Sequence, residues 1–126
     1  MNKRTVTLET HNAIVMATAP LLMVVPFLLS FSPGIGLASF FSGCVLIGVA
    51  LSDAAPAELF AGIDRNRLPV AAHADFDRAL GAVIIGLGIA AGIAGGQPLA
   101  SIFLVGFGAA HMAHTAITRY SARGAS

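Results

Sequence analysis

The feature that most constrains this chain is the absence of Asp, Glu, Lys and Arg from two long stretches, between Glu9 and Asp53 and between Arg78 and Arg119. Each stretch is about twice the roughly 20 residues that a helix needs to cross the hydrocarbon core of a bilayer. Only 10% of the 126 residues are charged and 56% are hydrophobic, whereas a soluble domain carries about 25% charged residues. The chain therefore needs lipid or a membrane complex as its solvent, and each stretch has room for two spans.

Turn residues divide both stretches near their middle. Residues 30–34 read Ser-Phe-Ser-Pro-Gly and residues 95–98 read Gly-Gly-Gln-Pro, and in each a proline can open the following helix. Asp75 is the expected N-cap of the third helix. The predicted fold is all-α, an integral membrane four-helix bundle made of two tandem transmembrane hairpins in parallel orientation. We expect helices near 12–31, 34–52, 76–94 and 98–119, within one membrane domain 1–126 comprising hairpin 11–53, cytoplasmic loop 54–72 and hairpin 73–119.

The charged residues all fall on one side of this predicted bundle. They lie before the first helix, around the central loop and after the last helix, and the two hairpin turns carry none. Because cytoplasmic loops collect Lys and Arg, we expect both termini and the central loop on the cytoplasmic side of a bacterial inner membrane.

The chain also contains an internal repeat. When the sequence is aligned with a shifted copy of itself, Leu-Ala-Ser-Phe-Phe at 37–41 matches Leu-Ala-Ser-Ile-Phe at 99–103, and the same shift places His11 on His73. Two copies of a two-span unit keep the same orientation, so their pseudo-two-fold axis should run along the membrane normal. The pattern predicts a duplicated hairpin.

In this arrangement, with Ser32-Pro33-Gly34 at the first turn, the chain resembles the SPW-repeat family of small bacterial membrane proteins. The unit of that family is two transmembrane helices around a Ser-Pro-Trp turn. Gly34 stands here in place of the tryptophan, and the chain contains no Trp. The resemblance implies the four-span fold and brings no biochemical activity with it.

Small residues recur at intervals of four on the last two predicted helices. Such residues let helix backbones approach closely in lipid, so we expect them to mark contact faces, either inside the bundle or with a partner. The candidate packing residues are Gly88, Gly92, Gly96, Gly106 and Ala110.

Histidines provide the candidate chemistry. His111 and His114 share one face of the expected helix 98–119, and imidazole binds haem iron and other metals. The Ala110-x-x-x-His114 spacing, with a small residue one turn before the histidine, resembles that of the pigment-binding helices of bacterial light-harvesting polypeptides. This resemblance makes haem or a bacteriochlorophyll the candidate cofactor. A metal or proton-relay site is another reading. Alternatively, the histidines hydrogen-bond to polar groups and tie the cytoplasmic ends together, the candidates being Thr10, Thr115, Asp75, Asp77 and loop backbone.

Signatures of catalysis and of nucleic-acid binding are missing. The chain has no Gly-x-Ser-x-Gly elbow, phosphate-binding loop or His-Glu-x-x-His helix, and a net charge of +1 is too small for a nucleic-acid footprint. We expect a non-catalytic accessory or scaffold subunit that packs, in the lipid bilayer, against other membrane subunits or further copies of itself. The rival is a tetrapyrrole or metal protein using His111 and His114. A small transporter or channel ranks third, because few polar residues lie at mid-membrane depth.

Overall fold

The chain folds into four long helices in the computed structural model, which describes residues 6–54 and 70–120. Each helix contains a span long and apolar enough to cross a membrane. The four predicted helices are thus confirmed, and most of the predicted loop 54–72 lies outside the described residues. The helices are α1 (Leu8–Leu28), α2 (Pro33–Ala54), α3 (Val70–Ile93) and α4 (Pro98–Ala116).

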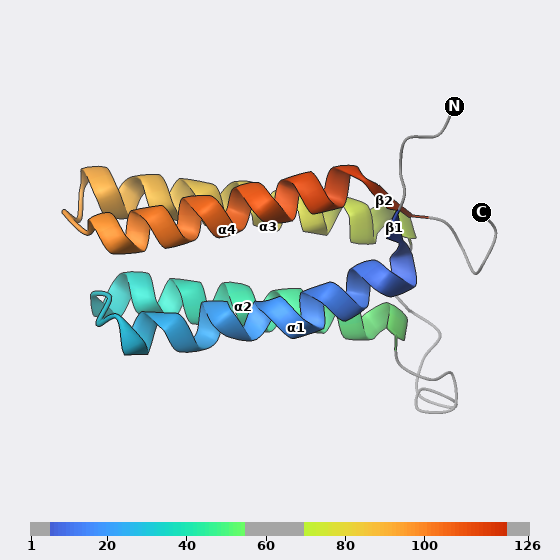
Figure 1. The fold of residues 1–126 in the computed structure, drawn as a ribbon, viewed down its shortest axis with the longest axis horizontal. Helices are drawn as coiled ribbons and strands as arrows, with labels where there is room; N and C mark the ends of the chain where they lie inside the picture. The colour runs from blue at the N-terminus through green and yellow to red at the C-terminus, as the bar shows by residue number, and fades with distance from the viewer. Residues whose placement is uncertain (1–5, 55–69, 121–126) are drawn as a thin grey trace.

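The helices form two hairpins that lie side by side. α1 packs along α2 and α3 along α4, with the two short turns at the same end of the bundle (Figure 1). All four helices contribute to one apolar core, where Leu22, Leu46, Ile84 and Leu104 are fully buried. Large apolar side chains such as Ile93 and Ile102 point outward and are exposed. An outer surface of this kind suits lipid rather than water.

The helix ends differ from the predicted ones in two places. α1 begins at Leu8 rather than near residue 12, because the Thr7 side chain caps it by accepting a hydrogen bond from the Thr10 amide. α3 begins at Val70 rather than near residue 76, so Asp75 lies inside the helix and the prediction that it is the N-cap was wrong. Pro33 and Pro98 open α2 and α4 as expected.

A pair of two-residue strands joins the segments before α1 and after α4. β1 (Val6–Thr7) pairs in parallel with β2 (Thr118–Arg119), and the Val6 amide donates to the Ile117 carbonyl at 3.0 Å. The hydrophobic pattern gave no sign of these strands. Their pairing fixes the chain that follows α4 against the start of α1.

The hairpin turns are also joined to each other, at the opposite end of the bundle. The Ser32 amide donates to Gln97 Oε1 at 2.9 Å, and Gln97 Nε2 donates to Ser32 Oγ at 2.8 Å. Polar contacts therefore connect the hairpins at both ends of the bundle.

Two of the candidate packing glycines face the neighbouring helix. A Cβ atom at Gly88 would lie 2.8 Å from the Val105 backbone nitrogen, and one at Gly92 would lie 2.7 Å from Ser101 Oγ. Neither separation leaves room for a methyl group. Gly88 and Gly92 thus permit the close approach of α3 and α4.

The other three candidates lie elsewhere. Gly96 is in the turn before α4, where its φ of +62° suits glycine, so its expected place on a helix contact face was wrong. Gly106 and Ala110 are exposed on the outer face of α4. Gly108, which was not among the candidates, also faces α3, because a Cβ there would lie 3.0 Å from the Ile85 backbone nitrogen.

A candidate metal centre at one end of the bundle

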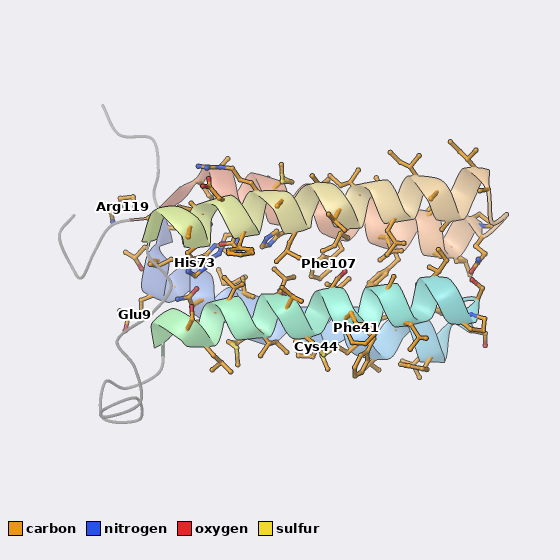
Figure 2. All side chains as sticks on the ribbon, turned by 180° about the vertical axis from the view of Figure 1, so that it is seen from behind. Glu9, Phe41, Cys44, His73, Phe107 and Arg119 are labelled. Atoms are coloured by element: carbon orange, nitrogen blue, oxygen red, sulfur yellow. The ribbon has the colours of Figure 1, made fainter. Side chains whose placement is uncertain are left out.

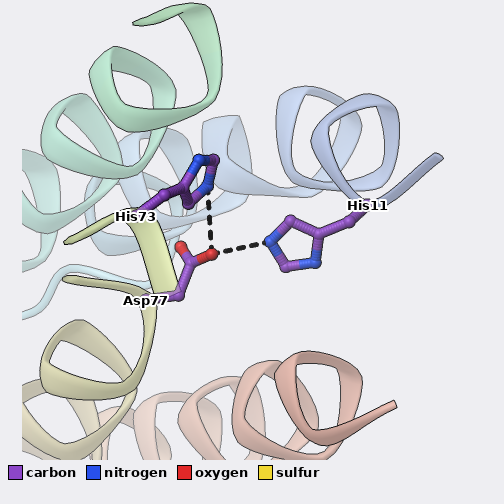
Figure 3. Close-up of side chains that lie close together, drawn as sticks. All are labelled: His11, His73 and Asp77. Atoms are coloured by element: carbon purple, nitrogen blue, oxygen red, sulfur yellow. Dashed lines mark hydrogen bonds and ion pairs between the residues drawn. The ribbon is translucent and has the colours of Figure 1, made fainter. Parts of the chain in front are cut away.

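Asp77 is the centre of a buried polar cluster near the β1 and β2 end of the bundle. Its Oδ2 atom lies 2.8 Å from His11 Nε2 and 3.1 Å from His73 Nε2 (Figure 3). The Tyr120 hydroxyl donates to the same oxygen at 2.7 Å. A carboxylate enclosed in an apolar bundle is stable only if it is hydrogen-bonded and paired with positive charge. Three groups here converge on one carboxylate oxygen.

The cluster draws on both hairpins. His73 and Asp77 are four residues apart on α3 and so share one face of that helix. His11 comes from α1, 66 residues before Asp77 in the chain. Figure 2 shows His73 near the end of the bundle, in the space between the two hairpins. The pairing of α1 with α3 across this space depends on the tertiary fold.

The hydrogen bonds of the Thr118 hydroxyl indicate that His11 carries a proton on Nδ1. The Thr118 hydroxyl makes its shorter contact, 2.7 Å, to the carbonyl of His114, and it lies 2.9 Å from His11 Nδ1. A hydroxyl has one proton to donate; we assign it to the carbonyl, so Nδ1 donates to the hydroxyl. His11 Nε2 then faces the Asp77 carboxylate with either a second proton or a lone pair. The contact therefore calls for a proton or another cation between the two atoms.

The two histidines singled out from the sequence flank this centre. His111 Nε2 lies 3.7 Å from Asp77 Oδ1, which is too far for a hydrogen bond. This Nε2 atom is buried and has no hydrogen-bond partner within the described part of the chain. The ring of His114 stacks on that of His11, with 4.3 Å between centroids. The shortest polar contacts thus join Asp77 to His11, His73 and Tyr120 rather than to the predicted pair.

Tyr120 closes the cluster from the segment after β2. Burial of the phenol raises the pKa of Tyr120 above that of an exposed tyrosine, and the hydrogen bond to the Asp77 carboxylate raises it further. Without a metal ion nearby, the hydroxyl therefore stays protonated and acts as a donor.

The cluster has the spacing of a metal site. The ligand atoms of His11, His73 and Asp77 all lie within 4.8 Å of one another. Around an ion bound at about 2.1 Å, neighbouring ligand atoms are about 3.0 to 3.5 Å apart. The contacts of Asp77 Oδ2 with the two imidazoles, at 2.8 and 3.1 Å, are close to this range, and the two imidazole nitrogens are no more than 4.8 Å apart. Two imidazoles and one carboxylate suit zinc, iron or nickel, whereas calcium and magnesium prefer all-oxygen sites and copper(I) prefers sulfur.

Two sequence signals could have found these residues. The His73-x-x-x-Asp77 spacing would place two ligands on one helix face, but the third helix was expected to begin only near residue 76, and the expected repeat aligns His11 with His73. The contribution of Tyr120 had no such signal, because β2 was not predicted. Comparison of the chain with known protein families, with curated proteins and with solved structures finds no match.

Proposed function

We propose that this is a multi-pass membrane protein that binds a first-row transition-metal ion through His11, His73 and Asp77. The observation that carries the proposal is the convergence of these three side chains, all buried, from both hairpins onto one point. A metal ion supplies the positive charge that Asp77 needs in an apolar bundle. It also accepts the Nε2 lone pair that His11 presents when its only proton is on Nδ1.

His111 is the natural additional ligand in this proposal. Its Nε2 atom is buried without a hydrogen-bond partner among the described residues, and an unpaired buried polar atom is costly. A short movement of the ring toward Asp77 brings this nitrogen to the ion. One of the two α4 histidines, His111, thus remains a proposed ligand, and the centre of the proposed site lies on α1 and α3.

Metal binding to protein purified in mild detergent tests the proposal. We expect one zinc or cobalt(II) ion per chain by elemental analysis and calorimetry, and cobalt(II) bands in the visible spectrum that report the coordination geometry. His73→Ala and Asp77→Ala should each abolish stoichiometric binding. Asp75→Ala is the matched control, since Asp75 lies on the same helix and is 79% exposed. A wild-type protein that binds neither ion would refute the proposal.

A second candidate function is that of a non-catalytic accessory subunit, and one observation favours it. Gly86, Ala90, Gly106 and Ala110 are exposed on the outer faces of α3 and α4, and a Cβ atom at Gly86 or Gly106 would meet nothing. Such small-residue faces admit another transmembrane helix. An Ala110→Cys variant made in a Cys44→Ser background should crosslink to a further subunit or a second copy. A cysteine at lipid-facing Phe27 is the control.

We place the four spans in a bacterial inner membrane with both termini and the central loop in the cytoplasm, on the basis of the positive charge at that end. Cysteine accessibility tests this orientation. A cysteine at Asn66 or Ser126, both outside the described residues, should react with an impermeant maleimide only in inverted vesicles. Labelling in intact cells would contradict the orientation.

We also propose that the bundle arose by duplication of one hairpin, as the resemblance to the SPW-repeat family implies. The starts of α1 and α3, and likewise the ends of α2 and α4, are separated by the same number of positions as His11 and His73. These two histidines contact one oxygen atom, as expected of equivalent residues near a two-fold axis. Superposition of residues 11–52 on 73–114 should need a single half-turn about the membrane normal. An axis in the membrane plane would contradict the duplication.

A further inference from the structure

The Tyr120 hydroxyl lies among the proposed metal ligands. It is 2.7 Å from Asp77 Oδ2 and 3.4 Å from His11 Nε2. The β1 and β2 pairing holds the chain at Thr118 and Arg119 against the start of α1, and Tyr120 follows directly. The phenol is therefore positioned by the backbone as well as by its own hydrogen bond.

Four of the six separations among four polar atoms are close to those between the ligands of a metal ion. Asp77 Oδ2, His11 Nε2, His73 Nε2 and the Tyr120 oxygen show contacts of 2.7, 2.8, 3.1 and 3.4 Å. Neighbouring ligands of a bound first-row metal are about 3.0 to 3.5 Å apart. The phenol oxygen thus lies close enough to Asp77 Oδ2 and His11 Nε2 to act as a fourth ligand.

We propose that Tyr120 binds the metal as a phenolate and that the site thereby takes up ferric iron. This inference rests on the proposed metal site. Phenolate and carboxylate are hard, anionic oxygen ligands, which suit a small trivalent ion. On binding, the phenolic O–H bond breaks, the iron–oxygen bond forms, and the proton leaves to water without electron transfer.

The charge balance explains how one site can hold either a divalent ion or ferric iron. A divalent ion with ionised Asp77 and a neutral Tyr120 leaves one net positive charge at the site. Ferric iron with Asp77 and the Tyr120 phenolate leaves the same net charge, because the departing proton offsets the third charge of the ion. Ionisation of Tyr120 therefore avoids an additional buried charge, whose desolvation costs much free energy in a low-dielectric interior.

Ferric loading of the purified protein tests the inference. Tyr120 is the only tyrosine in the chain, so with a tyrosine-free tag any tyrosinate signal must come from it. Addition of ferric nitrilotriacetate should produce a visible phenolate-to-iron charge-transfer band, which loading with zinc does not produce. Tyr120→Phe should lose the band and bind ferric iron about tenfold or more weakly, yet retain zinc.

The outcomes separate the two proposals. Ferric binding without the band would overturn the role of Tyr120 and leave the metal site standing, as would a Tyr120→Phe protein that keeps the band. Failure of the wild type to bind either zinc or iron would overturn both proposals. If Tyr120→Phe does not fold, resonance Raman spectroscopy of the ferric wild type decides alone. Tyrosinate ring modes enhanced within the band support the inference, and their absence overturns it.

Discussion

His11 in α1 and Asp77 in α3 join the two hairpins through a contact of 2.8 Å between Nε2 and Oδ2, and both side chains are almost completely buried. Each supplies what the other lacks, since the carboxylate needs positive charge and the imidazole needs a partner for its second nitrogen. The Ser32 and Gln97 pair performs the same joining at the opposite end of the bundle. The hairpins are thus connected by polar contacts at their ends and by apolar packing between them.

Asp77→Asn should strongly destabilise the bundle. Removal of one partner from a buried ion pair costs about 3 to 5 kcal/mol, and the amide cannot replace the charge that His11 and His73 face. Thermal unfolding in detergent, followed by circular dichroism, measures the effect. Asp75→Asn should leave the melting temperature unchanged, because Asp75 is exposed and, among the described residues, pairs with Arg78 alone at the surface. Equal shifts in the two variants would contradict the central role of Asp77.

The tight contact between α3 and α4 predicts a contrast between two glycines. Gly88→Ala should destabilise the protein by about 1 to 3 kcal/mol, because the added methyl group would lie 2.8 Å from the Val105 backbone nitrogen. Gly106→Ala should be neutral or slightly stabilising, since the added methyl group would contact no other atom and alanine favours the helix. Unfolding of both variants in the same detergent gives the comparison. A destabilised Gly106→Ala variant would indicate an additional packing partner.

The sequence alone predicted the number of helices well, because charge exclusion in a bilayer acts on every residue of a span. It also located the turns, from their Ser, Gly and Pro residues, and Pro33 and Pro98 open the second helix of each hairpin. Helix starts were less accurate. The cap at Thr7 is a local hydrogen bond that hydropathy does not record, and α3 extends through polar residues before its apolar stretch.

The site was predicted only in part, because its contacts depend on the packing of separate hairpins. Depth in the membrane drew attention to His111 and His114, whereas the carboxylate that organises the cluster lies near the charged end of α3 and was counted with the charges around the central loop. The hydrogen-bonding alternative for the histidines did include Asp77, and the contacts of Asp77 with His11 and His73 confirm that part of it. Tyr120 could not be found without the β1 and β2 pairing.

A double-mutant cycle at the hairpin turns should reveal coupling between Ser32 and Gln97. The side-chain hydrogen bond between them is 2.8 Å long and partly buried, so we expect a coupling energy of about 0.5 to 1.5 kcal/mol between Ser32→Ala and Gln97→Ala. A cycle between Ser32→Ala and Thr18→Ala is the control, because the Thr18 hydroxyl donates within its own helix, to the Ile14 carbonyl. Strictly additive effects of Ser32→Ala and Gln97→Ala would contradict the link between the turns.

Titration of Tyr120 in metal-free, chelator-treated protein should show a phenol that resists ionisation. Phenolate absorbance reports this one group, because the chain has no other tyrosine. An exposed tyrosine ionises near about pH 10, and burial and the Asp77 carboxylate raise the pKa of Tyr120 above that value. Above about pH 10 the unfolded chain has therefore lost a proton that the folded chain retains, so stability falls as the pH rises. Asp77→Asn should lower the titration midpoint by removing the negative charge beside the phenol. A wild-type midpoint at or below that of free tyrosine would contradict the hydrogen bond between Tyr120 and Asp77.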